Sequence, residues 1–220
     1  MFQDNELQSQ VMDELEWDTN LDASHIAVSV KDGIVTLTGY VSSYIYKKNA
    51  ERAAKRVKGV QAVVDDIELK LPGSGYRTDL DITEASLGML RYNALIPKDK
   101  IKLVVDNGWI ILDGEVDWYS QKVAAENALK YMLGIKGITN NVIVKPTVRV
   151  SEIKSKIQSA LTRNAQLDAN QITISAIDST VILGGYVRSL AEKDQAEKAA
   201  WSAPGVNKIE NNIVCRYLLR

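Results

Sequence analysis

A sequence unit that occurs three times constrains this chain more than any other feature. A shift of 75 residues places three glycines of the first unit on three of the second, Gly33 on Gly108, Gly39 on Gly114 and Gly59 on Gly134. A further shift of 71 residues carries the last two onto Gly185 and Gly205. Apolar positions coincide in the same register, so we expect an array of similar small domains.

Turn-rich stretches separate the three units. Pro72-Gly73-Ser74-Gly75 follows the first, and the shorter Lys145-Pro146-Thr147 follows the second. A length of 220 residues alone suggests one or two domains. The repeat instead predicts three domains, at 1–72, 76–146 and 148–220.

Each unit is predicted to run helix, strand, strand, helix, strand. In the first unit, residues 5–17 carry apolar side chains at helical spacing, and residues 26–30 and 34–40 alternate apolar and polar around an Asp32-Gly33 turn. These patterns predict a first helix followed by a β-hairpin.

The second helix of each unit has start and stop signals. Ser42 or Ser43 is placed to cap it in the first unit, an alanine stripe follows, and Gly59 ends it. Pro204-Gly205 makes the same stop in the third unit. This helix joins strands two and three as a crossover, so those strands should be parallel if adjacent.

The fold class that follows is α+β. We expect three tandem αββαβ two-layer sandwiches, each a three-stranded mixed sheet covered on one face by two helices. A unit of about 70 residues has a small core. Contacts between units would then add to stability.

A family resemblance rests on one motif, Val-x-Leu-x-Gly-x-Val, followed by an alanine-rich helix, a Gly-Val pair and a strand with Asn or Asp. The motif stands at 35–41, and with small departures at 110–116 and 181–187. It resembles the BON domain, and the whole chain resembles the bacterial osmotically inducible, OsmY-type proteins built from tandem BON domains. The resemblance implies an αββαβ sandwich, a bacterial origin, attachment to phospholipid surfaces under osmotic or envelope stress, and no catalytic residues.

The residues themselves give little support to enzyme chemistry. The single histidine, His25, precedes the first strand, and no Ser or Cys nucleophile is spaced to use it. The single cysteine, Cys215, occupies an apolar strand position and is interpreted as a buried small hydrophobe. We predict that the protein is not an enzyme and carries no cofactor.

A recurring Asx pair is interpreted as structural. Asp65-Asp66 looks like a carboxylate pair, but its counterparts are Asn140-Asn141 and Asn211-Asn212, which have no acidity. Recurrence in all three units predicts a bulge or turn in which the side chain bonds the backbone. The recurring glycines are likewise predicted to need a positive φ or a close backbone approach.

Charge and residue counts exclude several classes of partner. With a net charge of -1 no nucleic-acid partner is expected, and one His with one Cys excludes the common zinc sites. The N-terminus reads unlike a signal peptide, and no apolar run reaches the ~18 residues that span a bilayer. We therefore expect a cytoplasmic protein, or a periplasmic one if a leader has been removed.

Positions at which the repeats differ are where a binding site is sought. The second helix starts with Tyr44-Ile45-Tyr46 in the first unit and Trp118-Tyr119 in the second, but with Leu190-Ala191-Glu192 in the third. Tyr and Trp at such a rim fit a membrane interface or a protein contact. Trp201 replaces two lysines and is expected to be exposed, while Trp109 is expected to cap the sheet face. The alternative for all of them is packing between units.

The second helix of the first unit is also basic. Its only acidic residue is Glu51, whereas its basic residues are Lys47, Lys48, Arg52, Lys55, Arg56 and Lys58. On anionic lipid each cation near the surface contributes ~1 kcal/mol. The alternatives are a solvated face, or pairing with acidic groups of another unit.

The leading hypothesis is a binding protein that attaches to anionic phospholipid or to an envelope-associated partner. A scaffold that binds proteins through Trp118 or Tyr119 is the second hypothesis. Capture of a small ion or solute by backbone carbonyls of one unit is the third, and a hydrolase comes last.

Overall fold

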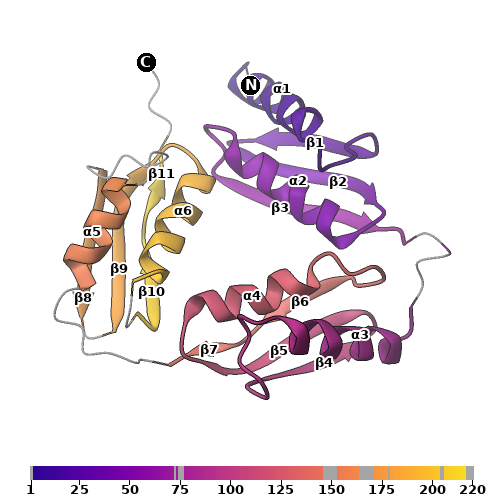
Figure 1. Ribbon diagram of the computed structural model, residues 1–220. Coiled ribbons are helices and arrows are strands. Elements are labelled where there is room, and N and C mark those ends of the chain that lie inside the picture. The colour runs from indigo at the N-terminus through magenta and orange to yellow at the C-terminus, as the bar shows by residue number, and fades with distance from the viewer. Residues whose placement is uncertain are drawn as a thin grey trace. The chain divides into compact units, whose positions relative to one another are not determined.

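A computed structural model describes residues 2–71, 73, 77–145, 153–163, 171–177, 179–203 and 206–216. It confirms the predicted order of helix, strand, strand, helix, strand in three successive α+β domains, each with its own sheet (Figure 1). The linker residues Pro72, Ser74, Gly75, Pro146 and Thr147, and the helix stop at Pro204-Gly205, lie outside the described residues. The domain boundaries stay a prediction.

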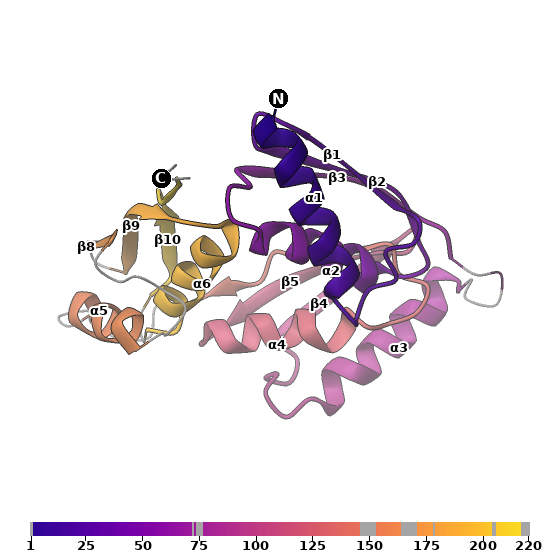
Figure 2. The same ribbon diagram turned by 90° about the horizontal axis from the view of Figure 1, so that it is seen from above.

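Domain 1 consists of α1 (Phe2–Trp17), β1 (Ile26–Lys31), β2 (Ile34–Val41), α2 (Tyr44–Arg56) and β3 (Ala62–Leu69). The central strand is β2, which pairs with β1 in antiparallel register. The predicted alanine stripe of α2 is fully buried, and so are Val11 of α1 and Val35 and Leu37 of β2. Figure 2 shows both helices on the same side of the sheet, as the two-layer prediction requires.

Domain 2 consists of α3 (Asp79–Tyr92), β4 (Ile101–Asp106), β5 (Trp109–Val116), α4 (Tyr119–Leu129), β6 (Gly137–Asn140) and β7 (Ile143–Val144). Strand β5 is antiparallel to β4 and parallel to both β6 and β7, which confirms the predicted crossover. Thr78 begins α3 with a capping box: its hydroxyl accepts from the Asp81 amide, and the Asp81 carboxylate accepts from the Thr78 amide.

Domain 3 consists of α5 (Ile153–Arg163), β8 (Ile172–Ile177), β9 (Thr180–Val187), α6 (Leu190–Trp201), β10 (Lys208–Asn211) and β11 (Val214–Cys215). Its pairing repeats that of domain 2, with β8 antiparallel and β10 and β11 parallel to β9. Ile157, Leu183, Ala196 and Ile213 are among the side chains of its buried core.

The first Asx of each pair bonds the backbone two residues ahead, as predicted. The amides of Ile67, Val142 and Ile213 donate to the Oδ1 atoms of Asp65, Asn140 and Asn211 at 3.3, 3.3 and 3.2 Å. In domains 2 and 3 the third strand is interrupted just after this residue, so the expected single strand is two segments there. Asn140 also reaches the helix layer, because its Nδ2 donates to the Lys122 carbonyl at 2.9 Å.

The glycine that recurs at positions 39, 114 and 185 is required by a close approach of the backbone. Gly39, Gly114 and Gly185 have φ values of 111°, 147° and 98°. A Cβ added there would lie 2.0, 2.1 and 2.0 Å from the carbonyl oxygens of His25, Lys100 and Gln171. Both the positive φ and the close approach that the repeat predicts are therefore present in every copy.

Helix capping differs between the copies. In domain 3, the Ser189 hydroxyl accepts from the Glu192 amide at 3.2 Å. In domain 1, the Ser43 hydroxyl oxygen is buried and has no hydrogen-bond partner among the described residues. The prediction that Ser43 caps α2 with its side chain is therefore wrong, and the Lys47 amide bonds the Ser43 carbonyl instead.

Candidate functional site

The start of α2 is less open than the sequence indicated. Tyr44 is 5% exposed, and Ile45 and Tyr46 are half-buried. The Tyr44 ring therefore does not belong to an exposed aromatic rim, which corrects its place among the binding candidates. Ile45 and Tyr46 offer part of their surface.

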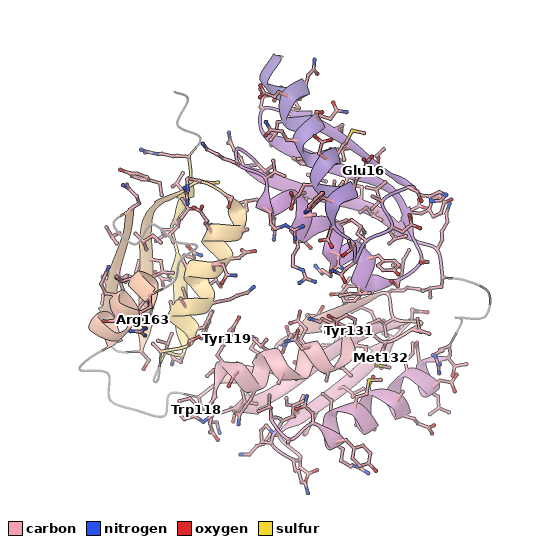
Figure 3. The ribbon with its side chains drawn as sticks, turned by 45° about the horizontal axis from the view of Figure 1, so that its top comes forward. Glu16, Trp118, Tyr119, Tyr131, Met132 and Arg163 are labelled. Carbon is pink, nitrogen blue, oxygen red and sulfur yellow. The ribbon has the colours of Figure 1, made fainter. Side chains whose placement is uncertain are left out.

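The start of α4 presents an aromatic side chain openly. Trp118 is 45% exposed and its backbone amide donates to Gln121 Oε1 at 3.1 Å, which fixes the helix start. Tyr119 follows as the first residue of α4 and is half-buried. Figure 3 shows Trp118 and Tyr119 at this end of α4, with Tyr131 and Met132 beyond its other end.

The remaining two tryptophans of the sequence hypothesis have different surroundings. Trp201 is half-buried and packs against the core of its own domain, so the expectation of an exposed Trp201 is wrong. Trp109 lies on the sheet as expected: its ring is against Gly137 of β6 and its Nε1 donates to Thr139 Oγ1 at 2.9 Å. Trp201 thus serves packing, while Trp109 keeps 46% of its surface exposed.

Part of the basic charge of α2 is neutralised along the helix itself. Glu51 accepts from Lys48 Nζ at 2.8 Å and from Lys55 Nζ at 2.9 Å. Burial opposes ionisation of Glu51, but the two ammonium groups outweigh it and lower the pKa of this carboxyl. Arg52 donates to Asn49 Oδ1 at 2.7 Å, and Lys47 is half-buried.

The last cation of α2 pairs with acidic groups of α1 and the residue that follows it. Arg56 donates to Glu14 at 2.6 Å and to Asp18 at 3.0 Å. Burial of Asp18 raises its pKa, but the hydrogen bonds from Arg56 and Asn20 outweigh burial and the net shift is downward. Both acidic partners of Arg56 are in domain 1. Lys55 Nζ, in contrast, also lies 3.7 Å from Asp194 Oδ2 of α6, so the alternative of pairing with another unit holds for Lys55. Lys48, Lys55 and Arg56 are therefore weaker lipid ligands than their number suggests.

Exposed apolar groups on the first helices were missed by the sequence reasoning. Trp17 and Tyr92 occupy equivalent ends of α1 and α3 and are 82% and 89% exposed. Domain 2 exposes further large apolar side chains along α3 and just after it, at Leu80, Leu87, Met89 and Leu95. The available signal was that the 75-residue shift places Tyr92 on Trp17, outside the buried stripe of either helix.

The single histidine has a hydroxyl neighbour that the sequence reasoning did not count. Ser24 Oγ lies 2.8 Å from His25 Nδ1 and 2.6 Å from Asp22 Oδ1, all on the surface. The Ser24 side-chain and backbone hydrogen bonds lower the pKa of Asp22. The Ser24 hydroxyl donates its proton to Asp22 in a local turn. The proton is therefore not directed at His25, and the three residues are not arranged as a nucleophile with its base.

The cysteine fits its predicted character only in part. Cys215 is half-buried and its burial raises the pKa of the thiol. A thiol with a raised pKa forms less of the reactive thiolate. The partial exposure departs from the buried small hydrophobe that was expected.

The described residues were also considered as metal ligands and as membrane-spanning helices, and they form neither. Within the described ranges, no three His, Cys, Asp or Glu side chains are grouped so as to hold a metal ion. Across the same part of the chain, every helix is too short or too polar to cross a bilayer.

Comparison with known proteins gives a family match and a few relatives. The chain is 30% identical over 130 residues to Osmotically-inducible protein Y of Escherichia coli (strain K12). That match covers 57% of this chain and 65% of the relative, so it spans less than two thirds of the relative's length. Two structures of CdsD, a structural protein of the type III secretion system of Chlamydia trachomatis, align over 96% of this chain. One is its C-terminal domain. The two alignments cover 98% and 92% of the CdsD chains at 13% and 15% sequence identity, each with a TM-score of 0.27.

The family model covers nearly the whole chain. The BON domain model matches three times, at residues 3–70, 78–146 and 149–217. Each match contains one helix-covered sheet with the recurring glycine and Asx residue described above. The chain is therefore a member of the BON domain family and carries three copies of the domain.

Proposed function

We propose that this chain is a non-enzymatic binding protein that attaches to anionic phospholipid surfaces during osmotic or envelope stress. The observation that carries the proposal is the exposure of Trp17 and Tyr92 at equivalent helix ends of two domains, 82% and 89%. Amphipathic aromatic side chains prefer the interface between water and lipid headgroups. The similarity to an osmotically inducible protein supports the link to osmotic stress.

Aliphatic groups on and just after α3 add to the exposed apolar surface of domain 2. Leu80 and Leu87 are exposed along α3, and Leu95 is exposed just after it. Burial of such groups in the headgroup region is favourable by ~25 cal/mol per Å². Cations of α2 in domain 1 contribute a salt-sensitive part, with Lys47, Lys48 and Arg52 as candidates. Ile45, Tyr46 and Lys55 stay in the candidate set with smaller expected effects.

Co-sedimentation with vesicles tests the proposal. The full chain should sediment with phosphatidylglycerol vesicles more than with phosphatidylcholine vesicles, and less at high salt. We expect Trp17→Ala with Tyr92→Ala to weaken binding by about tenfold, and Lys47→Glu, Lys48→Glu and Arg52→Glu together to remove the salt-sensitive part. Tyr131→Ala is the matched control, because it removes an exposed aromatic group elsewhere in domain 2.

The proposal is wrong if wild-type protein does not sediment with phosphatidylglycerol. It is also wrong if the Tyr131 control weakens binding as much as the double variant does. The location is tested separately. Cell fractionation under osmotic stress should place the protein in the cytoplasm, as we propose from the sequence, and recovery from the periplasm would support the alternative location.

A protein-binding scaffold is the second candidate function. Trp118 favours it, because this side chain is 45% exposed while its backbone is held by Gln121, and rigid exposed tryptophans are frequent anchors of protein interfaces. Cross-linking in cells should then capture a partner that is lost with Trp118→Ala or Tyr119→Ala. Vesicle binding by those variants would be unchanged.

A further inference from the structure

Domain 2 contains a cavity that shares only Leu87 with the exposed groups proposed above for lipid binding. It has a volume of about 330 Å³ and lies between the second half of α3 and the segment that leads into β4. Its apolar lining consists of Leu87, Leu90, Ile96, Pro97 and Ile101. This volume falls at the lower end of the range in which small-molecule sites are found.

The segment that closes the cavity is fixed by local hydrogen bonds. Asn93 ends α3, and its Oδ1 and carbonyl oxygen accept from the amides of Leu95 at 3.0 Å and Ile96 at 3.1 Å. These bonds hold Ile96 in its buried position. The wall of the cavity is therefore held by the chain itself, so that binding would not require ordering of this segment.

Two cations and one acid complete the lining. They are Arg91, Lys98 and Asp99. Within the described part of the chain, the side chains of Arg91 and Lys98 make no hydrogen bond or ion pair, whereas those of Lys48, Lys55 and Arg56 in domain 1 are all paired. The lining thus has one cation in excess over the acid, beside an apolar floor.

We propose that this cavity binds one molecule of a single-chain amphiphile with an anionic head, such as an alkyl carboxylate or alkyl phosphate. The alkyl chain lies on Leu87, Leu90 and Ile96, and the head pairs with the two cations. A charge-assisted pair with a guanidinium is the stronger of these contacts. This goes beyond attachment to a surface, because it concerns a monomeric ligand in a single cavity.

Domain 1 provides an internal comparison. The 75-residue shift places Glu16 on Arg91, Asp22 on Pro97 and Ala23 on Lys98. The same place in domain 1 is therefore acidic and would repel an anionic head. Binding is expected in domain 2 and not at the equivalent place in domain 1.

Titration of the full chain with sodium decanoate, kept monomeric, tests the proposal by calorimetry and by amide chemical shifts. We expect one bound decanoate, with shifts centred on residues 87–101. Arg91→Glu with Lys98→Glu should weaken binding at least tenfold, and Asp99→Asn should strengthen it. Lys102→Glu with Lys136→Glu is the matched control, since both are exposed lysines of the same domain that do not line the cavity.

Several outcomes would overturn the inference. They are no decanoate binding, shifts centred outside domain 2, or equal weakening by the control pair. Decanol tests the apolar part and inorganic phosphate tests the head alone, and each should bind more weakly than decanoate. Circular dichroism of every variant is the check that the fold is kept. Leu87→Gln disrupts the cavity without changing its charge and should also weaken binding.

The same variants on phosphatidylglycerol vesicles separate this inference from the proposed function. If vesicles bind and decanoate does not, the surface proposal stands and the cavity proposal fails. If decanoate binds and vesicles do not, the reverse holds.

Discussion

The ring of Trp109 lies so close to Gly137 that a Cβ at Gly137 would be 2.6–2.7 Å from three of the ring carbons. The two residues are direct partners in the parallel register of β5 and β6. The indole covers the backbone that glycine leaves bare, and its Nε1 bond to Thr139 holds it there. Of the three domains, only the second has a tryptophan at this strand start.

The Trp109–Gly137 pair predicts a non-additive response to mutation. Gly137→Ala should lower the free energy of unfolding by about 1–3 kcal/mol, because the new methyl group overpacks against the ring. In a Trp109→Ala background the same change should cost less than about 0.5 kcal/mol, since the obstructing ring is gone. Urea unfolding of the four proteins in a double-mutant cycle measures the difference. Equal costs in both backgrounds would contradict the contact.

Glycines of the same chain should respond to alanine with opposite signs. Gly114→Ala places a Cβ about 2.1 Å from the Lys100 carbonyl oxygen at a φ of 147°, so we expect a loss of at least about 2 kcal/mol. Gly88→Ala in α3 meets nothing within 4 Å and should stabilise by about 0.5–1 kcal/mol. Thermal unfolding of both variants tests the pair. A stabilised Gly114→Ala protein would refute the close approach.

Asn140 should be less replaceable than its neighbour. Asn140→Ala removes the bonds to the Val142 amide and the Lys122 carbonyl, and should cost about 1–3 kcal/mol because these groups are part-buried. Asn141→Ala keeps its backbone bond to Leu112 and should be nearly neutral. Denaturant midpoints decide between them, and similar losses for both variants would argue against a specific role for the first Asx.

The Arg56 pair should give domain 1 a pH-dependent stability. The pKa of Asp18 is lowered below its ordinary value of 3.8, despite the opposing effect of burial, by bonds from Arg56 and Asn20. Its contribution is therefore present above pH 3.8 and lost as the pH falls through the lowered pKa. Arg56→Gln should cost at most about 1 kcal/mol at pH 7, given the partial exposure of the pair, and almost nothing at pH 2.

Arg52→Gln is the control for that prediction. Its partner Asn49 does not titrate, so its effect should be the same at both pH values. Unfolding free energies of the two variants at pH 7 and pH 2 make the comparison. An Arg56 effect that persists at pH 2 would show that packing of the side chain, not the ion pair, matters.

Much of each domain could be predicted because the repeat supplies three readings of the same fold. Gly39 was recognised as structural because glycine recurs at its position in all three units. Asp65 was recognised because its counterparts are uncharged asparagines. The site was harder to predict, because exposure depends on tertiary packing that a repeat alignment does not encode. Tyr44 and Trp201 look equally available in sequence, but one is buried and the other packs on a core.

Pairing of charges was also beyond the sequence alone. The basic pattern of α2 was clear, but whether Arg56 meets lipid or Glu14 depends on how α1 crosses the sheet. The cavity of domain 2 had no sequence signal, because Leu87 and Ile96 read as ordinary apolar positions and Arg91 and Lys98 as ordinary surface cations. Only the folded geometry places them around one space.

The interruption at Asn140 and Asn211 has a consequence for assembly. In domains 2 and 3 the interrupted strand is an outer one, where unpaired backbone groups could recruit a strand from another molecule. Two short segments of four and two residues offer a poor template for such addition. In domain 1 the eight-residue β3 is continuous, but Asp65, Asp66 and Glu68 line it with negative charge. The third strand of each domain is therefore a poor template for pairing edge to edge with another copy.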